Sequence, residues 1–376
     1  MALVGRIILN PPRRVRDNAP YLSPMNKVNL RAVPEVEQRS PSGKFHSFGR
    51  NLSLALGGVR NTGVWGGGHP FDLQLRRLPP GAAVCPFHAH LNQWELFVVH
   101  AGRGMVRAGA KTYPVRKGDV FMHPPGEPHQ LINSGKADLE VLIIADNPTF
   151  DACHYPDSGK WAFGPPARIF RMIECDYFDG EDAVERLAPK PLGRVGGNAS
   201  HPVYRPLPAP LPKPSTPFIR RRVNLSGLKW EHWKSPGGRF AQAGKDPSDA
   251  IGDTRNDWPQ KGHPFNLELV KVPAGKSACP FHWHSAQSEL FWILEGTATI
   301  RAGKKRFKAK AGDIVLHPPF EPHELINDGR RPVTFYIIAD NPPVDYWRYP
   351  DSDKWGLRAP RKIFRMTGVD YHDGEE

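Results

Sequence analysis

The sequence is poor in cysteine and in long apolar stretches, and both shortages limit the kind of protein that it can be. Four cysteines in 376 residues are too few for the dense disulfide framework of small secreted domains. No apolar run reaches the roughly 18 residues that a membrane-spanning helix needs. The weakly apolar start, 1–10, meets two prolines and a basic stretch, without the cleavage pattern of a signal peptide. We therefore expect a cytoplasmic protein with no membrane partner.

Long helical periodicity is also missing. The chain contains 41 prolines and 36 glycines, and a proline inside a helix removes a hydrogen bond and clashes with the preceding turn. Short runs rich in Val, Ile and Phe are present instead, for example 140–145 and 335–339. Punctuated by Pro and Gly, they are typical of many short strands. The sequence predicts an all-β protein, built as a barrel or a sandwich.

The charge is unbalanced, with a formal net charge of +13. Such an excess can serve a nucleic acid, an anionic membrane surface or a small anionic substrate. The basic clusters at 220–222 and 304–306 are short, and no recognised nucleic-acid motif surrounds them. We expect no nucleic-acid partner. Two interpretations stay open, namely ordinary solvated basic faces and the attraction of a small anionic substrate.

One pattern is written twice in this chain. The segment 85–90, Cys-Pro-Phe-His-Ala-His, returns as 279–284, Cys-Pro-Phe-His-Trp-His, and a glutamate and a third histidine follow each copy at one fixed offset of 194 residues. The recurring residues are His88, His90, Glu95 and His129 in the first copy and His282, His284, Glu289 and His323 in the second. The copies align without a gap from 85 to 172, a period far longer than that of a solenoid repeat. Each copy should therefore be a whole domain.

The length supports this division, because 376 residues suit about two domains of typical size. We expect an N-terminal extension over 1–22, a first domain over 23–181, a proline-rich linker over 182–216 and a second domain over 217–376. Proline-rich composition favours an extended, semi-rigid connector. An ordered strap along the domain surfaces is the alternative.

Strand geometry gives the repeated histidines a common direction. Side chains two positions apart on a strand point to the same face, so His88 and His90 can converge. Glu95 lies an odd number of positions beyond His90, so the chain must turn between them, and we expect Glu95 to open the next strand, beside the first. Glu95, Phe97 and Val99 would then share one face. His129 follows a Pro-Pro-Gly turn and would lie on a third strand.

Three imidazoles and one carboxylate form a plausible set of metal ligands in each copy. With no thiolate in the set, the site suits Fe, Mn, Ni, Cu or Zn rather than an iron–sulfur cluster. Four protein ligands on a six-coordinate metal leave two positions open, whereas a zinc ion closed by four ligands would be structural. We predict one divalent transition metal per domain, held by His88, His90, Glu95 and His129 and by their four counterparts.

At this point the chain resembles a bicupin of the cupin superfamily. The first cupin motif, His-x-His followed by Glu and then Gly, matches His88, His90, Glu95 and Gly102, and it matches again in the second copy. The second motif, Gly, Pro-x-Gly, His and Asn, is complete from Gly118 to Asn133. In the second copy Phe320 replaces the glycine of Pro-x-Gly. The resemblance implies two tandem double-stranded β-helix barrels of the jelly-roll type, paired face to face as a pseudo-dimer within one chain. A homo-oligomer is a further possibility.

The motif specifies a metal site more sharply than a reaction, because cupins host many activities. Our first hypothesis is a dioxygenase that uses iron, O₂ and a small anionic organic substrate. The alternatives are redox-neutral decarboxylation or isomerisation at a Lewis-acidic metal, and a metal-stabilised small-molecule-binding protein without turnover. The redox-neutral reactions need a proton donor. The sequence marks none clearly, so the catalytic residues beyond the metal ligands remain unassigned.

Overall fold

The computed structural model describes residues 26–60, 62–164, 168–172, 214, 216–252, 262–358, 362–369 and 373. The predicted N-terminal extension over 1–22 lies outside the described residues, and so does the predicted linker over 182–216 except 214 and 216. The described residues contain 29 strands, two four-residue α-helices and three short 3-10 turns. The predicted all-β class is confirmed.

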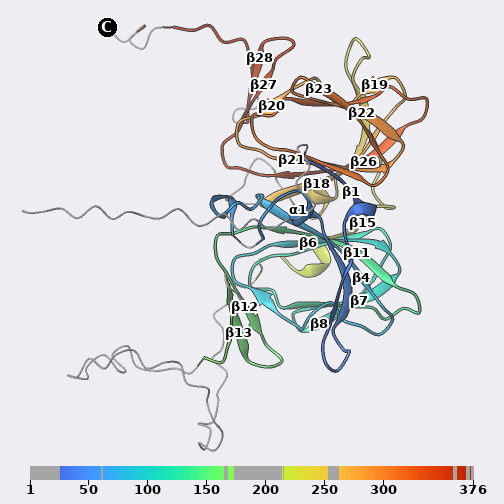
Figure 1. Ribbon diagram of the computed structural model, residues 1–376, viewed down its shortest axis with the longest axis vertical. Helices are drawn as coiled ribbons and strands as arrows, with labels where there is room; N and C mark the ends of the chain where they lie inside the picture. The colour runs from blue at the N-terminus through green and yellow to red at the C-terminus, as the bar shows by residue number, and fades with distance from the viewer. Residues whose placement is uncertain are drawn as a thin grey trace, which may run out of the picture.

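Two barrels of the same design lie one above the other (Figure 1). The larger sheet of the first barrel has the spatial order β15 (Arg222–Asn224), β9 (Asp119–His123), β6 (Glu95–Ala101), β11 (Leu139–Asp146), β4 (Phe71–Leu78), β3 (His46–Asn51) and β2 (Val36–Arg39). Two smaller sheets complete it. One is β10 (His129–Ile132), β7 (Arg103–Ala108) and β8 (Lys111–Arg116), and the other is β14 (Arg168–Phe170), β13 (Lys160–Gly164), β12 (Asp151–Tyr155) and β5 (Ala89–His90).

The second barrel repeats this plan. Its larger sheet has the order β1 (Lys27–Asn29), β24 (Asp313–His317), β21 (Glu289–Glu295), β26 (Val333–Asp340), β18 (Phe265–Val272), β17 (Ala241–Lys245) and β16 (Glu231–Lys234). The smaller sheets are β19 (Lys276–Ser277), β25 (His323–Asn327), β22 (Thr297–Ala302) and β23 (Lys305–Lys310), and β20 (Trp283–His284), β27 (Tyr346–Tyr349), β28 (Lys354–Leu357) and β29 (Lys362–Phe364). All the strand pairs within these sheets are antiparallel.

The two halves exchange a strand. β1, from the beginning of the described chain, pairs with β24 of the second barrel, and β15, which follows the predicted linker, pairs with β9 of the first. Each exchanged strand carries a basic residue to a buried aspartate, with Lys27 Nζ 2.8 Å from Asp313 Oδ2 and Arg222 Nη2 2.7 Å from Asp119 Oδ2. Each exchanged strand lies in one predicted domain and pairs with a strand of the other. The domain boundaries at 23 and 217 stay a prediction.

A shared hydrophobic core joins the barrels. The larger sheets alternate inward and outward side chains, as strand geometry requires. On β4, Leu73 and Leu75 face the other barrel, and on β18 Leu267 has the same role; all three belong to one cluster drawn from both halves of the chain. Each barrel also has its own core, around Phe121 in the first and Phe335 in the second. The two barrels therefore pack as one body.

The described residues also contain short helical segments, namely α1 (Leu52–Ala55), α2 (Pro247–Ala250), η1 (Leu30–Ala32), η2 (Val64–Gly66) and η3 (Phe218–Arg220). Of these, α1 and α2 occupy corresponding places in the two halves. The buried hydroxyls of Ser53 and Ser248 accept hydrogen bonds from the backbone N–H groups of Leu73 and Leu267, both at 2.8 Å. No helix among the described residues is long and apolar enough to cross a membrane.

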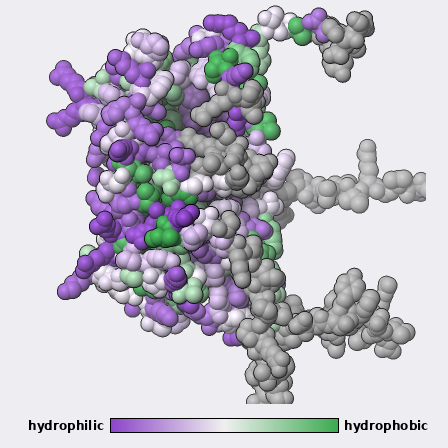
Figure 2. Space-filling view, turned by 180° about the vertical axis from the view of Figure 1, so that it is seen from behind, coloured by the Kyte–Doolittle hydropathy of each residue, from purple (hydrophilic) through white to green (hydrophobic). Residues whose placement is uncertain are grey.

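The face seen in Figure 2 is mainly hydrophilic, with small hydrophobic areas among charged and polar side chains. Scattered apolar residues on a surface of this kind are normal for a globular protein.

Candidate metal centres

Three short strands deliver the repeated residues of the first copy to one place. His90 ends β5, Glu95 opens β6 and His129 opens β10. His88 precedes β5 and makes an isolated antiparallel bridge to His129. The prediction that Glu95, Phe97 and Val99 share a face is confirmed, because Phe97 and Val99 enter the core inside the barrel and Glu95 lines the same cavity as Phe97.

One detail of the predicted arrangement is wrong. β6 does not lie beside β5. The two-residue strand β5 pairs with β12 in a smaller sheet, whereas β6 pairs with β9 and β11 in the larger one. The turn over 91–94 thus carries the chain from one sheet to another. The glutamate reaches the histidines across the interior of the barrel, because both sheets point side chains inward.

The donor atoms of the first cluster converge closely. One ligand atom each from His88, His90, Glu95 and His129 lies within 4.8 Å of all the others. His88 Nε2 is 3.0 Å from His90 Nε2, and His129 Nε2 is 2.7 Å from Glu95 Oε2. The second cluster is looser. His282, Glu289 and His323 form such a group, but His284 falls outside it although its Nε2 is 3.8 Å from Glu289 Oε1.

The hydrogen bonds behind the imidazoles fix which nitrogen faces the centre. His88 Nδ1 contacts the carbonyl oxygen of Pro86 at 3.0 Å, and His129 Nδ1 contacts that of Glu127 at 3.0 Å. A carbonyl only accepts, so each Nδ1 carries the proton and each Nε2 presents a lone pair to the centre. His90 Nδ1 contacts the carboxylate of Asp151, so its Nε2 also faces the centre. His88 Nε2 and His90 Nε2 lie 3.0 Å apart, and two lone pairs at that distance repel unless a cation or a proton lies between them. This arrangement fits a metal ion.

A carboxylate orients the middle histidine of each cluster. Asp151 Oδ2 lies 2.5 Å from His90 Nδ1, and Asp345 Oδ2 lies 2.6 Å from His284 Nδ1. In metalloproteins such a carboxylate fixes the ring and raises the basicity of the ligand. Sequence reasoning missed both aspartates, although they obey the same offset of 194 residues as the ligands. The repetition of these aspartates at that offset could have identified them from the sequence.

Charge in the first cluster is balanced between acid and base. Burial alone would raise the pKa of Glu95, but His90 and His129 outweigh it and hold that pKa below its usual range. Burial, helped by His129, lowers the pKa of His88 well below the usual value. Burial also acts to lower the pKa of His90, but Glu95 and Asp151 overcome it and raise that pKa. An ionised Glu95 carboxylate beside a neutral His88 thus favours a positive charge among these side chains.

A cavity of about 280 Å³ opens onto the first cluster. Besides the four clustered residues, Gln38, Gln74 and Arg76 of the larger sheet line it, together with Arg60 from the loop after α1. Tyr155 lines it as well, with its ring 6.1 Å from that of His88. Burial raises the pKa of Tyr155 to about 12, so its hydroxyl stays protonated. The cavity offers hydrogen-bond donors and positive charge.

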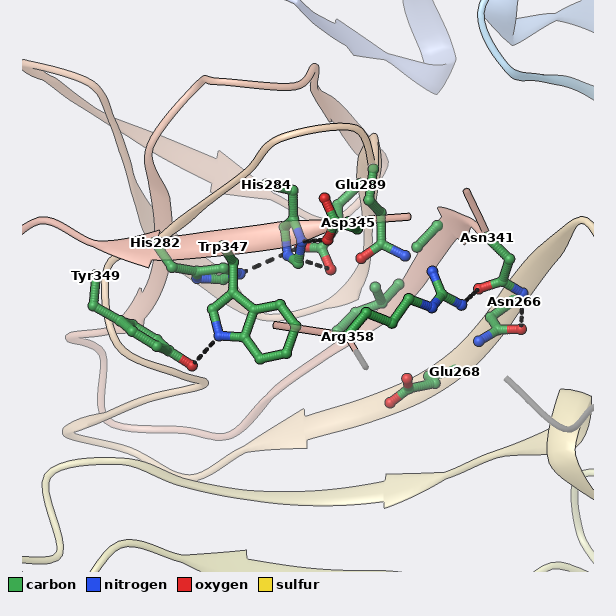
Figure 3. A pocket seen from close by; sticks show the side chains of 13 residues that line it. Asn266, Glu268, His282, His284, Glu289, Asn341, Asp345, Trp347, Tyr349 and Arg358 are labelled. Atoms are coloured by element: carbon green, nitrogen blue, oxygen red, sulfur yellow. Dashed lines mark hydrogen bonds and ion pairs between the residues drawn. The ribbon is translucent and has the colours of Figure 1, made fainter. Parts of the chain in front are cut away.

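The second cluster opens onto a cavity of about 250 Å³ with a different lining. Figure 3 shows His282, His284 and Glu289 near one another, with Glu268 and Arg358 elsewhere in the pocket. Glu268 replaces Gln74 of the first half, and Val270 replaces Arg76. Sequence reasoning missed Arg76, Glu268 and Arg358, because residues that differ between the copies carry no repeat signal.

A buried ion pair stands behind the first cluster. His123 stacks on His129 with ring centroids 4.1 Å apart, and its Nδ1 lies 2.7 Å from Glu127 Oε2. Arg221, which is only 4% exposed, contacts the other oxygen of Glu127 from the second half of the chain. The corresponding His317 also stacks on His323, at 4.2 Å. Arg221 of the exchanged segment therefore contacts the ligand candidate His129 indirectly, through Glu127 and His123.

The comparisons with known proteins agree with this architecture. The cupin-domain family matches residues 74–145 and again 268–339. The chain is a bicupin. Over 84% of its length it superposes on 86% of the oxalate decarboxylase of Lactobacillus farciminis, with a TM-score of 0.50 and 16% identity. At that identity the likeness concerns the fold alone.

Two curated proteins are similar to this bicupin in sequence. An oxalate-binding protein of Thermotoga maritima is 35% identical over 68 residues, which are 18% of this chain and 55% of that protein. A gentisate 1,2-dioxygenase from a Streptomyces species is 23% identical over 270 residues, which are 69% of this chain and 66% of that protein. The bicupin thus spans little more than half of the first relative and just under two thirds of the second.

Proposed function

We propose that this bicupin is a metal-dependent enzyme that acts on a small organic anion, with one divalent transition metal in each barrel. The ligands are His88, His90, Glu95 and His129 in the first barrel and His282, His284, Glu289 and His323 in the second. The observation that carries the proposal is the convergence of four donor atoms within 4.8 Å at a cavity lined by arginines.

The charge of the proposed centre favours an anionic substrate. Three neutral imidazoles and one carboxylate around a divalent ion leave a net positive charge, which an anionic ligand would neutralise. Arg76 and Arg60 add positive charge to the same cavity. The two curated relatives support the choice of substrate, since one is described as binding oxalate and the other as acting on gentisate.

For the first barrel we propose a dioxygenase reaction with iron. The bound metal would supply positions at which an anion and O₂ meet. A dioxygenase places both atoms of O₂ in the organic product, so the substrate provides all the electrons and no separate reductant is needed. Arg76 would bind an anionic group, Tyr155 would donate a hydrogen bond from its protonated hydroxyl, and Asp151 would hold the ring of His90 in place.

The second barrel favours a different candidate reaction, redox-neutral proton transfer such as decarboxylation or isomerisation. Such a reaction needs a proton donor or acceptor near the substrate, and the Glu268 carboxyl lies in the cavity that contains His282, His284 and Glu289. The first barrel has an amide, Gln74, at this position, and an amide cannot serve that purpose.

Metal analysis of protein purified without added metal tests the proposed ligands. We expect about two equivalents per chain, and His90→Ala and His284→Ala should each lower the content by about one, because three remaining ligands hold the ion more weakly. His46→Ala, on β3 outside both clusters, is the control and should keep both ions. Unchanged metal content in both ligand variants would refute the assignment.

The reaction is tested separately. The iron-loaded protein is given a panel of aromatic and dicarboxylic acids, and both O₂ uptake and CO₂ release are followed. O₂ consumption that disappears in His90→Ala supports the dioxygenase. CO₂ release without O₂ consumption, lost in Glu268→Gln, supports the redox-neutral alternative. The absence of both with every acid would count against a dioxygenase and against a decarboxylase, and would leave isomerisation to be followed by chromatography of the acids.

A further inference from the structure

The inner face of the first barrel's larger sheet continues well beyond the four clustered residues. The registers pair Val99 with Val141, Val141 with Arg76, Arg76 with Gly49, and Gly49 with Val36. Because directly paired residues point to the same side of a sheet, this row runs inside the barrel from β6 across to the edge strand β2.

The Arg76 side chain lies along this face with only neutral partners. Its guanidinium donates to Gln38 Oε1 at 2.7 Å, to Gln74 Oε1 at 2.6 Å and, at the edge of hydrogen-bonding distance, to Ser47 Oγ at 3.4 Å. Among the described residues, no carboxylate forms an ion pair with it. A largely buried guanidinium with no carboxylate in contact is costly unless an anion completes its shell. Its surroundings are therefore those of an anion-binding group.

Arg76 lies apart from the four clustered residues. Glu95 is on β6 and Arg76 on β4, with β11 between them, so their strands lie about 10 Å apart along the sheet. The guanidinium extends further outward, over Gly49 of β3, where a Cβ would come within 2.6 Å of Arg76 Nη1. A ligand that contacts both the cluster and this guanidinium must therefore extend past β11, the strand between them.

A second cavity of about 350 Å³ adjoins the first along the same face. Gln38, Arg60, Gln74 and Arg76 line both cavities, so the polar residues that end the first begin the second. Its remaining lining is largely apolar and includes Val33, Val36, Leu54 and Ala55. The space around Arg76 can therefore accept the carbon chain of a ligand as well as its charge.

We infer that the first barrel contains a second anion subsite at Arg76, and that its substrate is an elongated organic acid with an oxygen-rich end at the clustered histidines and a carboxylate several carbon atoms away. This inference rests on the proposed metal-dependent function of the same site. Arg60 lines both cavities beside Arg76, although its Nε also lies 3.9 Å from Asp72 Oδ2.

The second barrel provides a matched control. Val270 replaces Arg76, and Gly244, which pairs with Val270, has open space where its Cβ would stand. Gly49 and Gly244 thus occupy equivalent positions in the two barrels, but only Gly49 is covered by an arginine side chain. Alanine at 49 would displace the guanidinium, whereas alanine at 244 meets nothing.

Binding of straight-chain dicarboxylates tests the subsite. Calorimetry on the manganese-loaded protein compares acids of two to eight carbons with the monocarboxylate of each length. We expect the long dicarboxylates to bind at least about tenfold more tightly than the matched monocarboxylates, the gain expected of one charged hydrogen-bonded pair. Arg76→Gln should abolish this preference, Arg76→Lys should restore part of it, Gly49→Ala should weaken it and Gly244→Ala should leave it unchanged.

A metal-free arm separates this inference from the proposed function. Hexanoate should still bind weakly to the metal-free protein, and this binding should be lost in metal-free Arg76→Gln. As a control, Arg76→Gln purified with its metal should match the parent in metal content and in circular dichroism. If metal binding fails but this dependence on Arg76 remains, the subsite stands and the metal proposal falls. Oxalate binding as tight as that of the long acids, or a series unaffected by Arg76→Gln, would overturn the subsite.

Discussion

A single residue distinguishes the turns that present the third histidine in the two barrels. Gly126 has φ +82° and Phe320 has φ +64°, so both lie in the left-handed region that glycine adopts readily and other residues rarely do. The backbone N–H of each donates to the carbonyl of the middle histidine, His90 or His284, at 2.8 Å. The hydrogen bond holds the turn in place even where its residue is unsuited to it.

Phe320→Gly should therefore be more stable than Phe320→Ala. Phe320 is 60% exposed, and its ring centroid lies 5.3 Å from that of Trp283. Both variants remove this ring, but only glycine relieves the left-handed backbone. The expected difference in the free energy of unfolding is about 1 kcal/mol, measured by chemical denaturation. Gly126→Ala should lose a similar amount. Equal stability of the two Phe320 variants would show that the turn carries no strain.

At the scale of single elements, the exchanged segment 217–224 links the second half of the chain to the first site. Phe218 stacks on His123 at 5.2 Å between ring centroids, and Arg221 pairs with the buried Glu127. Burial alone would raise the pKa of Glu127, but hydrogen bonds from His123 and Arg221 lower it to about 2. This pair therefore stabilises the fold above the ordinary carboxyl pKa, and that contribution is lost as the pH falls toward 2.

Arg221→Gln should destabilise the protein by about 3–5 kcal/mol at neutral pH, because it leaves the Glu127 charge buried without its partner. The loss should shrink below pH 4, where the carboxyl of the variant becomes protonated. Lys308→Gln, which removes an exposed pair with Asp328, is the control and should cost less than about 1 kcal/mol. Denaturation of both variants at several pH values gives the comparison. A pH-independent loss would mean that Arg221 acts through packing alone.

The sequence predicted the fold because the fold depends on a repeated pattern, and the same pattern named the eight proposed ligands, of which the structure brings seven into two groups. It could not predict the exchanged strands, since β1 and β15 have three residues each and their partners are chosen by distant contacts. It also gave no sign of Arg76 or Glu268, which differ between the halves and gain meaning only from the register of β4 and β18. It also could not predict that β5 and β6 belong to different sheets, because the pairing of β5 with β12 and of β6 with β9 and β11 depends on residues far along the chain.

At the scale of the whole molecule, the barrels share one core and should unfold together. Phe71 of the first barrel and Phe265 of the second are fully buried in the common cluster, whereas Leu131 belongs to the core of the first barrel alone. A contact network that crosses between the barrels passes destabilisation from one to the other, as in any single cooperative unit.

Phe71→Ala should cost about 3–5 kcal/mol and speed hydrogen exchange in both barrels. Mass spectrometry of β22, in the second barrel, is the measurement, because β22 lies far along the chain from the substituted residue. Leu131→Ala is the comparison, since it opens a cavity away from the shared core. Protection of β22 that stays unchanged in Phe71→Ala would mean that the barrels unfold independently.

The reciprocal strand exchange also determines what half of this protein would be. A chain ending after the first barrel would carry β1 with no β24 to pair with, and it would leave the edge of its own β9 open. Two such chains could satisfy each other's edges in a closed twofold pair. The tandem protein has the layout of such a pair joined into one polypeptide. Proteolytic cleavage of the chain between the two barrels should therefore leave the two fragments associated, because each fragment still supplies a strand to the other's sheet.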